Sequence, residues 1–560
     1  MAQVKTRHDT RPIDVPRTNR NHPIRNMTSL PAGKVVPLVA IPLLREDSMN
    51  GRFQFVFQMQ QTVEVLLNGI DVVAEAWMVP HLAMPEFRTM DDLNLAMYGE
   101  AREGEPVVPF FKTAVAPEPN VNQILQRLGK HRKPGLPYNT MYERAYNAIV
   151  NHSRKEASPN IPLRDDMDRT LAQALWPTNK FAHLVADFDQ AVMEGEVALS
   201  IAEQNLILKG TDGGRYVPVA GNGQPLQAVG NVNTAGRVIQ SYEVDNKMAL
   251  QGAVIGTQNI MNIKNLRADL QGAVAQLATN GISISLANIN LAREAQVFAN
   301  IRKRYNAHED MIIRMLMDGM HVPEQAWLQP TKLNETRTRF GMNKRYSSDA
   351  DALNVSMVDG VCAMNMTVSV PQCPPGGVMM IVAYIAPEQL FERQMDPYLA
   401  ATSAEDLPSF IADHLDPEFV DVVKNQYIDQ DHDEPDDTYA YGPGNFMWND
   451  NGPGIGGRFH RPEVDAGYDE DRNALWAVET QNPRLTKDAY LVPADIHLKP
   501  FWTSTIDPFD CITLGKVIIN GLTQFGPLLI EALPNESDYD AILDQVDQTR
   551  IQREPVPVSS

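Results

Sequence analysis

Residues 51–60 read GRFQFVFQMQ, and their alternation decides the class of fold. Apolar residues at positions 53, 55, 57 and 59 alternate with arginine or glutamine, and Val56 is the one exception. Successive side chains of a strand point to opposite faces, so a period of two places these apolar side chains on a single face. The stretch predicts a strand with one face in a core and the other face in solvent.

Further strand-like stretches lie near both ends of the chain, mainly within residues 35–80, 354–386 and 495–533. Asn68-Gly69 is a turn signal in the first group, and Pro371–Gly377 predicts a turn in the second. Strands at the two ends must pair with each other to complete a sheet, so the residues between them are insertions. The sequence therefore predicts a mainly β fold, an antiparallel sandwich with long helical and loop insertions.

Two helices are expected among these insertions. Residues 138–155 place Tyr142, Tyr146 and Ile149 on one helical face, and residues 282–305 show the clearest apolar stripe of the chain. The second helix ends in consecutive basic residues, which suit the negative end of a helix dipole.

Composition divides the chain into an arm, one large domain and several excursions. Residues 1–34 hold seven Lys or Arg against two Asp and several X-Pro steps, which predicts an irregular basic arm ahead of a sandwich domain over 35–560. Residues 209–281 are rich in Gly, Asn, Gln and Ala, which predicts a surface-exposed insertion. Residues 401–460 are expected to form an acidic, Gly/Pro-rich loop region, and residues 534–560 a C-terminal tail.

Bulk composition excludes several classes of protein. The net charge of −21 argues against a protein that coats nucleic acid over its whole surface. The longest apolar stretches are too short to span a bilayer, and no apolar core follows the basic N-terminal residues, so neither an anchor nor a secretory signal is expected. Cys362, Cys373 and Cys511 are expected to be reduced, buried thiols; a pair between the first two is the alternative.

The catalytic motifs of this sequence are incomplete or lack the structural context that they need. Residues 452–457 match G-x-G-x-x-G, but neither a strand before them nor a helix after them is expected, so a dinucleotide site is not predicted. The chain has no complete P-loop, G-x-S-x-G or H-E-x-x-H motif, and its histidines have no ligand spacing. The sequence predicts a protein that is not an enzyme and needs no organic cofactor.

One acidic run resembles a cation site. Alternating carboxylates can converge on a hard cation such as Ca²⁺, although this run lacks the glycine and the distal glutamate of an EF-hand loop. A solvated acidic loop is the favoured interpretation, and a structural Ca²⁺ is the alternative; its candidate ligands are Asp429, Asp431, Asp433 and Glu434.

Two basic features are candidates for nucleic-acid binding. Extended basic segments hold phosphates by charge and hydrogen bonding without reading sequence. The N-terminal arm supplies Lys5, Arg7, Arg11, Arg17, Arg20 and Arg25, and a turn bounded by Gly and Pro supplies Lys130, Arg132 and Lys133. An ordinary solvated tail and loop is the competing interpretation of both.

Several segments, taken in order, resemble the major capsid protein of the Microviridae, the tailless icosahedral single-stranded-DNA bacteriophages. They are the strand-to-loop passage at 69–100, LPYN at 136–139 followed by MYERAYNAIVNHSRKEAS, the helical passage at 286–333, and GGVMMIVAYIAPEQLFERQMDPYL at 376–399. The family's aromatic run is reduced here to Trp77, and Met84–Met97 stands in place of its Trp-rich helix. The resemblance is to a divergent member.

The resemblance implies a single eight-stranded antiparallel jelly roll, sixty copies of which form a T=1 shell around a circular single-stranded DNA genome. It places the genome against the inner surface and offers residues 209–281 as a protrusion at the three-fold axes. It also implies a virion location, host cytoplasm during assembly, no membrane, and contacts with spike, pilot or DNA-binding proteins and a host-cell receptor. A tail, portal or spike component is the first alternative, and a β-rich hydrolase using Asp429 and Glu434 is the second.

Overall fold

The computed structural model describes twelve stretches of the chain. They are residues 13–177 (except 103 and 119), 184–186, 239–244, 248–255, 258–262, 310–320, 327–346, 356–409 (except 392), 420–449, 454–459, 474–476 and 482–526. The expected helix over 282–305 and the expected tail over 534–560 lie outside these residues.

Contacts between Cα atoms divide the chain into two compact units. The first comprises Met1–Val192 and Arg314–Ser560, and the second comprises Met193–Ile313. Within the second, β8 (Ile239–Val244), β9 (Met248–Ile255) and β10 (Gln258–Asn262) form a three-stranded antiparallel sheet. These strands fall in the expected insertion over 209–281, whose other residues are outside the described part of the chain.

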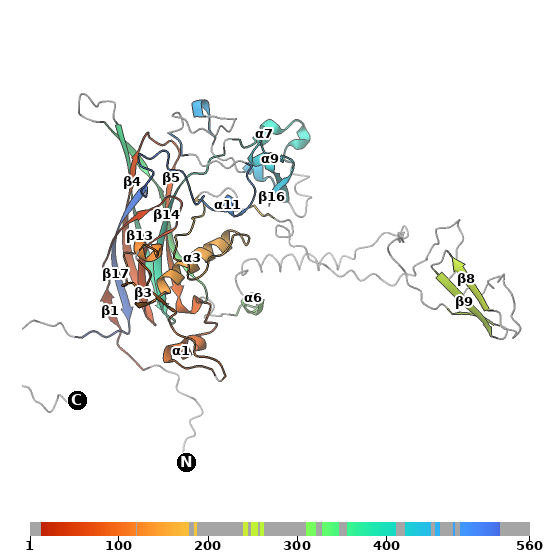
Figure 1. Ribbon diagram of the computed structural model, residues 1–560, viewed down its shortest axis with the longest axis horizontal. Coiled ribbons are helices and arrows are strands. Elements are labelled where there is room, and N and C mark those ends of the chain that lie inside the picture. The colour runs from red at the N-terminus through yellow and green to blue at the C-terminus, as the bar shows by residue number, and fades with distance from the viewer. Residues whose placement is uncertain are drawn as a thin grey trace, which may run out of the picture. The chain divides into compact units, whose positions relative to one another are not determined.

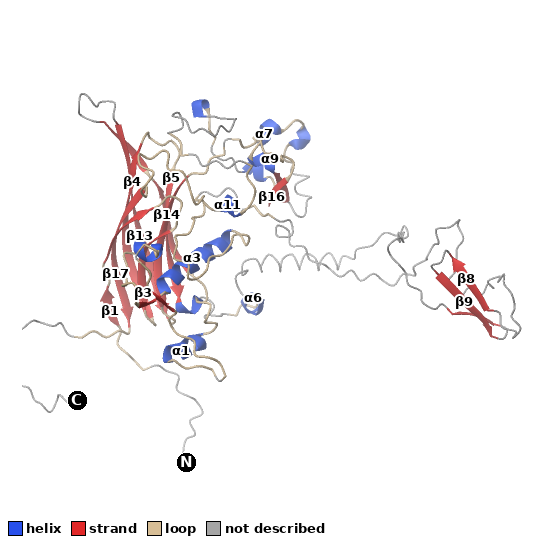
Figure 2. Ribbon diagram, in the orientation of Figure 1, coloured by secondary structure: helices blue, strands red, loops and turns tan. Residues whose placement is uncertain are grey.

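Two antiparallel sheets form the body of the first unit, so the fold is mainly β as predicted (Figures 1 and 2). The six-stranded sheet has the order β1-β17-β4-β13-β12, and β2 pairs with the other half of β17. Its strands are β1 (Thr18–Asn21), β2 (Ile24–Leu30), β17 (Phe509–Gly521), β4 (Asp47–Thr62), β13 (Ser356–Cys373) and β12 (Gly341–Tyr346). The four-stranded sheet has the order β11-β5-β14-β3, formed by β11 (Thr331–Arg339), β5 (Ile70–Pro80), β14 (Gly377–Pro387) and β3 (Val36–Leu43).

The predicted alternation of residues 51–60 fixes how β4 lies in its sheet. Phe53, Phe55 and Phe57 are at most 2% exposed and belong to the core between the two sheets. The arginine and glutamines between them are exposed on the other face. Met364 of β13 and Ile381 of β14 close the same core from the two sheets.

A second core lies on the far face of the four-stranded sheet. There α3 (Met141–Ala157) packs through Tyr146 and Ile149 against Trp77 and Met380. This helix confirms the one expected over 138–155, and Figure 1 shows it beside β14 and β3. The four-stranded sheet is therefore buried on both faces, whereas the six-stranded sheet is buried on one.

Shorter elements complete the described chain. The small pairs are β6 (Thr113–Val115) with β7 (Pro137–Asn139) and β15 (Val420–Lys424) with β16 (Thr438–Pro443). The remaining helices are η1 (His81–Ala83), α1 (Met90–Tyr98), α2 (Gln123–Arg127), α6 (Asp310–Met317), α7 (Pro397–Ala400), η3 (Ala404–Asp406), α9 (Asn425–Ile428), α10 (Phe446–Asn449), η4 (Gly457–Phe459) and α11 (Lys487–Tyr490). None of the helices described is both long and apolar enough to cross a bilayer.

The structure corrects two segment boundaries. Residues 18–30, expected as part of an irregular arm over 1–34, are strands β1 and β2 of the six-stranded sheet. The expected loop region over 401–460 contains the β15–β16 hairpin, which packs Val423 and Ala440 into a small third core. Strands β1 and β2 are ordered by β17, which is distant in sequence, whereas β15 and β16 pair with each other within the acidic region.

The three cysteines agree with their predicted state. Cys362, Cys373 and Cys511 are all free thiols and are buried. Burial raises the pKa of the Cys373 and Cys511 thiols to about 12. They contribute as small apolar side chains to the core between the sheets.

Candidate nucleic-acid interface

A groove of about 300 Å³ lies beside the predicted basic turn. It is bounded by α2, by the turn itself and by Tyr138 of β7. Its lining residues are Ala116, Pro117, Glu118, Asn122, Leu125, Gln126, Gly129, Lys130, His131, Arg132 and Tyr138. Two of the nine residues predicted to contact nucleic acid, Lys130 and Arg132, are among them.

The turn is built by the end of α2. Asn122 caps this helix, because its side-chain oxygen accepts a hydrogen bond from the backbone N–H of Leu125. Gly129 follows the helix with φ +64°, a left-handed conformation that glycine adopts without strain. The Lys130 N–H then donates to the Leu125 carbonyl, which closes the helix end and turns the basic residues away from it.

The basic side chains of the turn differ in their surroundings. Lys130 is half-buried, its Nζ lies 4.8 Å from the centre of the Tyr142 ring, and burial lowers its pKa. Arg132 and Lys133 are exposed, and neither forms an ion pair with a described residue. The turn therefore presents positive charge that no described residue neutralises.

A buried polar cluster holds the wall of the groove. Glu143 of α3 is 1% exposed, and its Oε1 accepts hydrogen bonds from the Tyr138 hydroxyl at 2.5 Å and from the Asn122 side-chain amide. Burial raises the pKa of Glu143; burial and the Glu143 hydrogen bond raise the pKa of Tyr138 to about 12. These bonds fix the Tyr138 ring and the Asn122 amide at the groove. An anionic ligand there meets cations, an amide and an aromatic ring, together with the exposed carboxylate of Glu118.

The N-terminal basic residues fall into three groups. Lys5, Arg7 and Arg11 lie outside the described residues. Arg17 donates to Asn520 and to the Glu46 carbonyl, and Arg20 forms an ion pair with buried Asp47, so both hold β1 against the sheet. Arg25 of β2 is exposed and makes no ion pair within the described chain.

The strand that carries Arg25 passes near the basic turn, although Arg25 itself points to the other face of the sheet. The Asn26 side-chain amide donates to the Arg127 carbonyl at 3.2 Å, so β2 runs beside the end of α2. Burial and the positive charge of Lys130 both lower the pKa of His22, which precedes β2. The two basic features predicted separately from the sequence therefore lie on adjoining segments.

The candidate calcium ligands do not converge. Asp429 is buried and its Oδ2 lies 2.7 Å from Arg393; Glu434 Oε2 lies 2.6 Å from Arg484. Asp433 accepts a hydrogen bond from Asn482 at 2.6 Å, and Asp431 is largely exposed. Asp429 and Asp431 share Arg393, whereas Asp433 and Glu434 face other side chains, and no group of three potential metal ligands occurs among the described residues. The favoured interpretation of a solvated acidic loop agrees with exposed Asp431, Asp433 and Glu434 but not with Asp429, which is 3% exposed.

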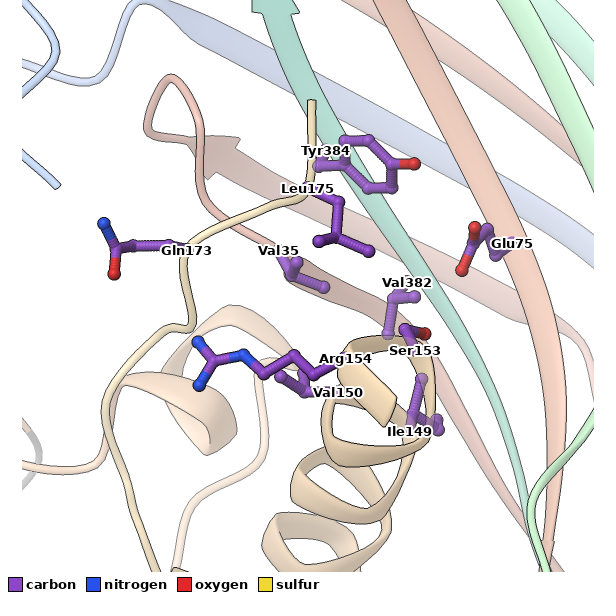
Figure 3. A pocket seen from close by; sticks show the side chains of 10 residues that line it. All are labelled: Val35, Glu75, Ile149, Val150, Ser153, Arg154, Gln173, Leu175, Val382 and Tyr384. Carbon is purple, nitrogen blue, oxygen red and sulfur yellow. The ribbon is translucent and has the colours of Figure 1, made fainter. Parts of the chain in front are cut away.

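A small cavity of about 40 Å³ lies between α3 and β14. Figure 3 shows Glu75 and Tyr384 on the strand side and Ser153 and Arg154 on the helix. Glu75 accepts from Trp77 Nε1 at 2.9 Å and pairs with Lys332 at 3.1 Å, so its charge is already compensated. The volume suits a few water molecules rather than a substrate or cofactor.

The sequence prediction missed the polar residues in the wall of the groove, which are Asn122, Gln126 and Tyr138. They come from α2 and β7, and their only sequence signal is nearness to the basic turn. Comparison of the sequence with protein-family models and with curated proteins finds no match to either. Function is therefore inferred from the residues of the chain and their geometry.

Proposed function

We propose that this protein is the major capsid protein of a tailless icosahedral bacteriophage, assembling sixty copies into a T=1 shell around circular single-stranded DNA. The order of the strands carries the proposal. When β2, β3, β4, β5, β11, β13, β14 and β17 are numbered one to eight along the chain, the sheets have the orders 1-8-3-6 and 2-7-4-5. This order supports the eight-stranded jelly roll of the proposal, an architecture used by viral capsid proteins and also by lectins and cupins.

Surface chemistry supports association with further copies. Large apolar side chains are exposed outside the two sheets, including Trp502 at 75%, Leu399 at 82% and Tyr98 at 75%. The connections that carry them, after β5 and after β14, are long enough to reach neighbouring subunits. Aromatic side chains such as those of Trp502 and Tyr98 are enriched at protein interfaces relative to the rest of a protein surface.

The basic turn supports an orientation for the subunit. In the proposed shell the groove beside Lys130 faces the genome, because it combines unneutralised cations with amide donors. The insertion over 209–281 is proposed to form the three-fold protrusion. A virion location, assembly in host cytoplasm, and contacts with spike, pilot or DNA-binding proteins and a host receptor complete the proposal.

Negative-stain electron microscopy of the expressed full-length protein tests the proposal. Closed particles of one diameter, sedimenting as a single large species, are the expected result. Rings or tubes would instead favour a portal or tail component. A protein that remains monomeric across concentration and salt would overturn the assembly proposal, and hydrolysis of a carbohydrate substrate would point to the jelly-roll enzymes.

A further inference from the structure

The outer face of the six-stranded sheet is open to solvent. Along β4 and β17, side chains alternate between the core and this face, and those on it are exposed or half-buried. The helices lie on the side of the four-stranded sheet (Figure 2). No described element covers this face.

The centre of the face is polar and cationic. It combines amide and hydroxyl groups with three basic residues. Leu514 and Ile518 of β17, 42% and 50% exposed, lie on the same face on either side of Lys516, and no carboxylate or aromatic ring lies among these side chains. This sheet-face patch consists of Arg25, Asn50, Arg52, Gln54, Asn365, Thr367, Ser369 and Lys516. Asp510, the exposed acid of β17, lies six residues from Lys516, which corresponds to about 20 Å along a strand.

Two of the cations lie directly opposite each other. Arg52 of β4 pairs in register with Lys516 of β17. Arg25 of β2 is opposite Leu514, so it lies diagonally across from Lys516, at about 7–8 Å between backbones. Like charges placed opposite each other destabilise a sheet. Neither Arg52 nor Lys516 forms an ion pair with any described residue, although the chain carries a net charge of −21.

We propose that the sheet-face patch binds the phosphate backbone of single-stranded nucleic acid, an inference that rests on the proposed function and extends it to residues outside the basic turn. A phosphate between Arg52 and Lys516 removes their repulsion. Asn50, Gln54 and Asn365 offer amides that donate to phosphate or sugar oxygens. Because the patch has no ring for bases to stack on, it contacts the backbone and is indifferent to base sequence.

An acidic protein segment is the competing occupant, and the acidic residues of this chain fit that role poorly. In the 420–449 region, Asp429 pairs with Arg393, Asp436 with Lys424 and Glu434 with Arg484. These carboxylates are already partly neutralised within their own chain. A nucleic acid supplies evenly spaced charges without such partners.

The test compares the double variant Arg52→Gln/Lys516→Gln with the charge-matched control Arg88→Gln/Lys155→Gln. The control residues are exposed and belong to the helical segments next to the other sheet. Binding of a fluorescent thirty-nucleotide poly-dT to the full-length protein is followed by anisotropy at several salt concentrations. We expect the patch variant to bind roughly fivefold more weakly or worse, with a salt slope shallower by about 1.4, the value for two lost phosphate contacts.

Independent measurements separate the outcomes. Thermal unfolding of the patch variant is expected at the wild-type temperature or above, since a repulsion is removed. If the unfolding temperature falls instead, the single variant Arg25→Gln, on another strand, replaces the double variant. Its salt slope is expected to change by about 0.7.

If the wild-type protein binds poly-dT and the patch variants bind it with the same affinity and salt slope, the patch proposal is overturned and the shell proposal stands. Equal competition by polyglutamate overturns the choice of nucleic acid. Failure of the wild-type protein to form shells in the microscope counts against the proposed function itself.

Discussion

Exposed cations of the basic turn are the residues whose role is most directly tested by substitution. Arg132 and Lys133 make no ion pair with a described residue, so replacing both by glutamine costs the fold little. We expect particles of the variant to form normally but to retain less DNA. The affinity of the variant for an oligonucleotide at low salt should fall roughly tenfold or more. The ratio of absorbance at 260 and 280 nm of purified particles measures retention, and equal ratios for variant and wild type would contradict the role.

His81 gives the protein a defined response to acid. Burial and the positive charge of Arg144 lower the pKa of His81 to about 4, and the rings of Phe110 and Phe111 lie beside it. In the unfolded chain this imidazole titrates near 6.5. Between those values only the unfolded state takes up the proton, so stability falls as pH falls and is unaffected above the upper value.

The expected size of this effect is on the order of 3 kcal/mol of unfolding free energy by pH 4, from about 1.4 kcal/mol per unit of pKa. Thermal midpoints measured from pH 7 to pH 4 should drop less steeply in His81→Gln than in the wild type. His131→Gln is the matched control, because His131 is exposed in the basic turn. Identical pH profiles for wild type and His81→Gln would disprove the assignment.

At the scale of elements, one buried hydroxyl of α3 forms hydrogen bonds that link this helix to the sandwich. The Tyr146 hydroxyl donates to the Val35 carbonyl at 2.6 Å and accepts from the Ala172 N–H at 2.9 Å. It thereby joins the helix to the start of β3 and to the segment alongside. Since both backbone groups are buried with it, loss of the hydroxyl leaves them without this partner.

Tyr146→Phe is therefore expected to lower the unfolding free energy by about 2 kcal/mol. Tyr142→Phe is the control on the same helix, because its half-buried hydroxyl has no hydrogen-bond partner among the described residues. Chemical denaturation of both variants measures the difference. A Tyr146→Phe protein as stable as Tyr142→Phe would show that the hydroxyl contributes nothing net.

The elements that the sequence predicts are those with strong local patterns. The phenylalanines of β4 repeat every second residue, and α3 repeats its apolar residues with a helical period, so both are recognised alone. By contrast, β1 and β2 are polar and flanked by prolines, and they are strands because β17 supplies their hydrogen-bond partners 490 or so residues away. Such pairing leaves no local signal.

The same reason limits what the sequence reveals about sites. Asp429, Asp431, Asp433 and Glu434 are neighbours in sequence, yet their partners are three different residues, Arg393, Asn482 and Arg484. Arg52 and Lys516 are 464 positions apart, and only the register of β4 and β17 makes them neighbours. Spacing along the chain predicts a cluster only when the backbone between its members is already known.

For the whole molecule, salt is expected to act in opposite directions on assembly and on DNA binding. Copies with a net charge of −21 repel one another, and salt screens that repulsion over about 10 Å at 0.1 M. Light scattering should therefore show assembly without DNA increasing from about 20 to 150 mM salt. Oligonucleotide affinity should decline over the same range. Assembly that weakens with salt would indicate that contacts between opposite charges dominate the interfaces.

The position of β17 between β2 and β4 has a consequence for synthesis of the protein on the ribosome. Residues 24–62 leave the ribosome long before β17, the strand that joins them. At 5–20 residues per second, the gap of 447 residues between Thr62 and Phe509 leaves those edges unpaired for roughly 20 to 90 s. A nascent chain truncated before residue 509 lacks the strand between β2 and β4, so the six-stranded sheet is completed only after residues 509–521 have been translated.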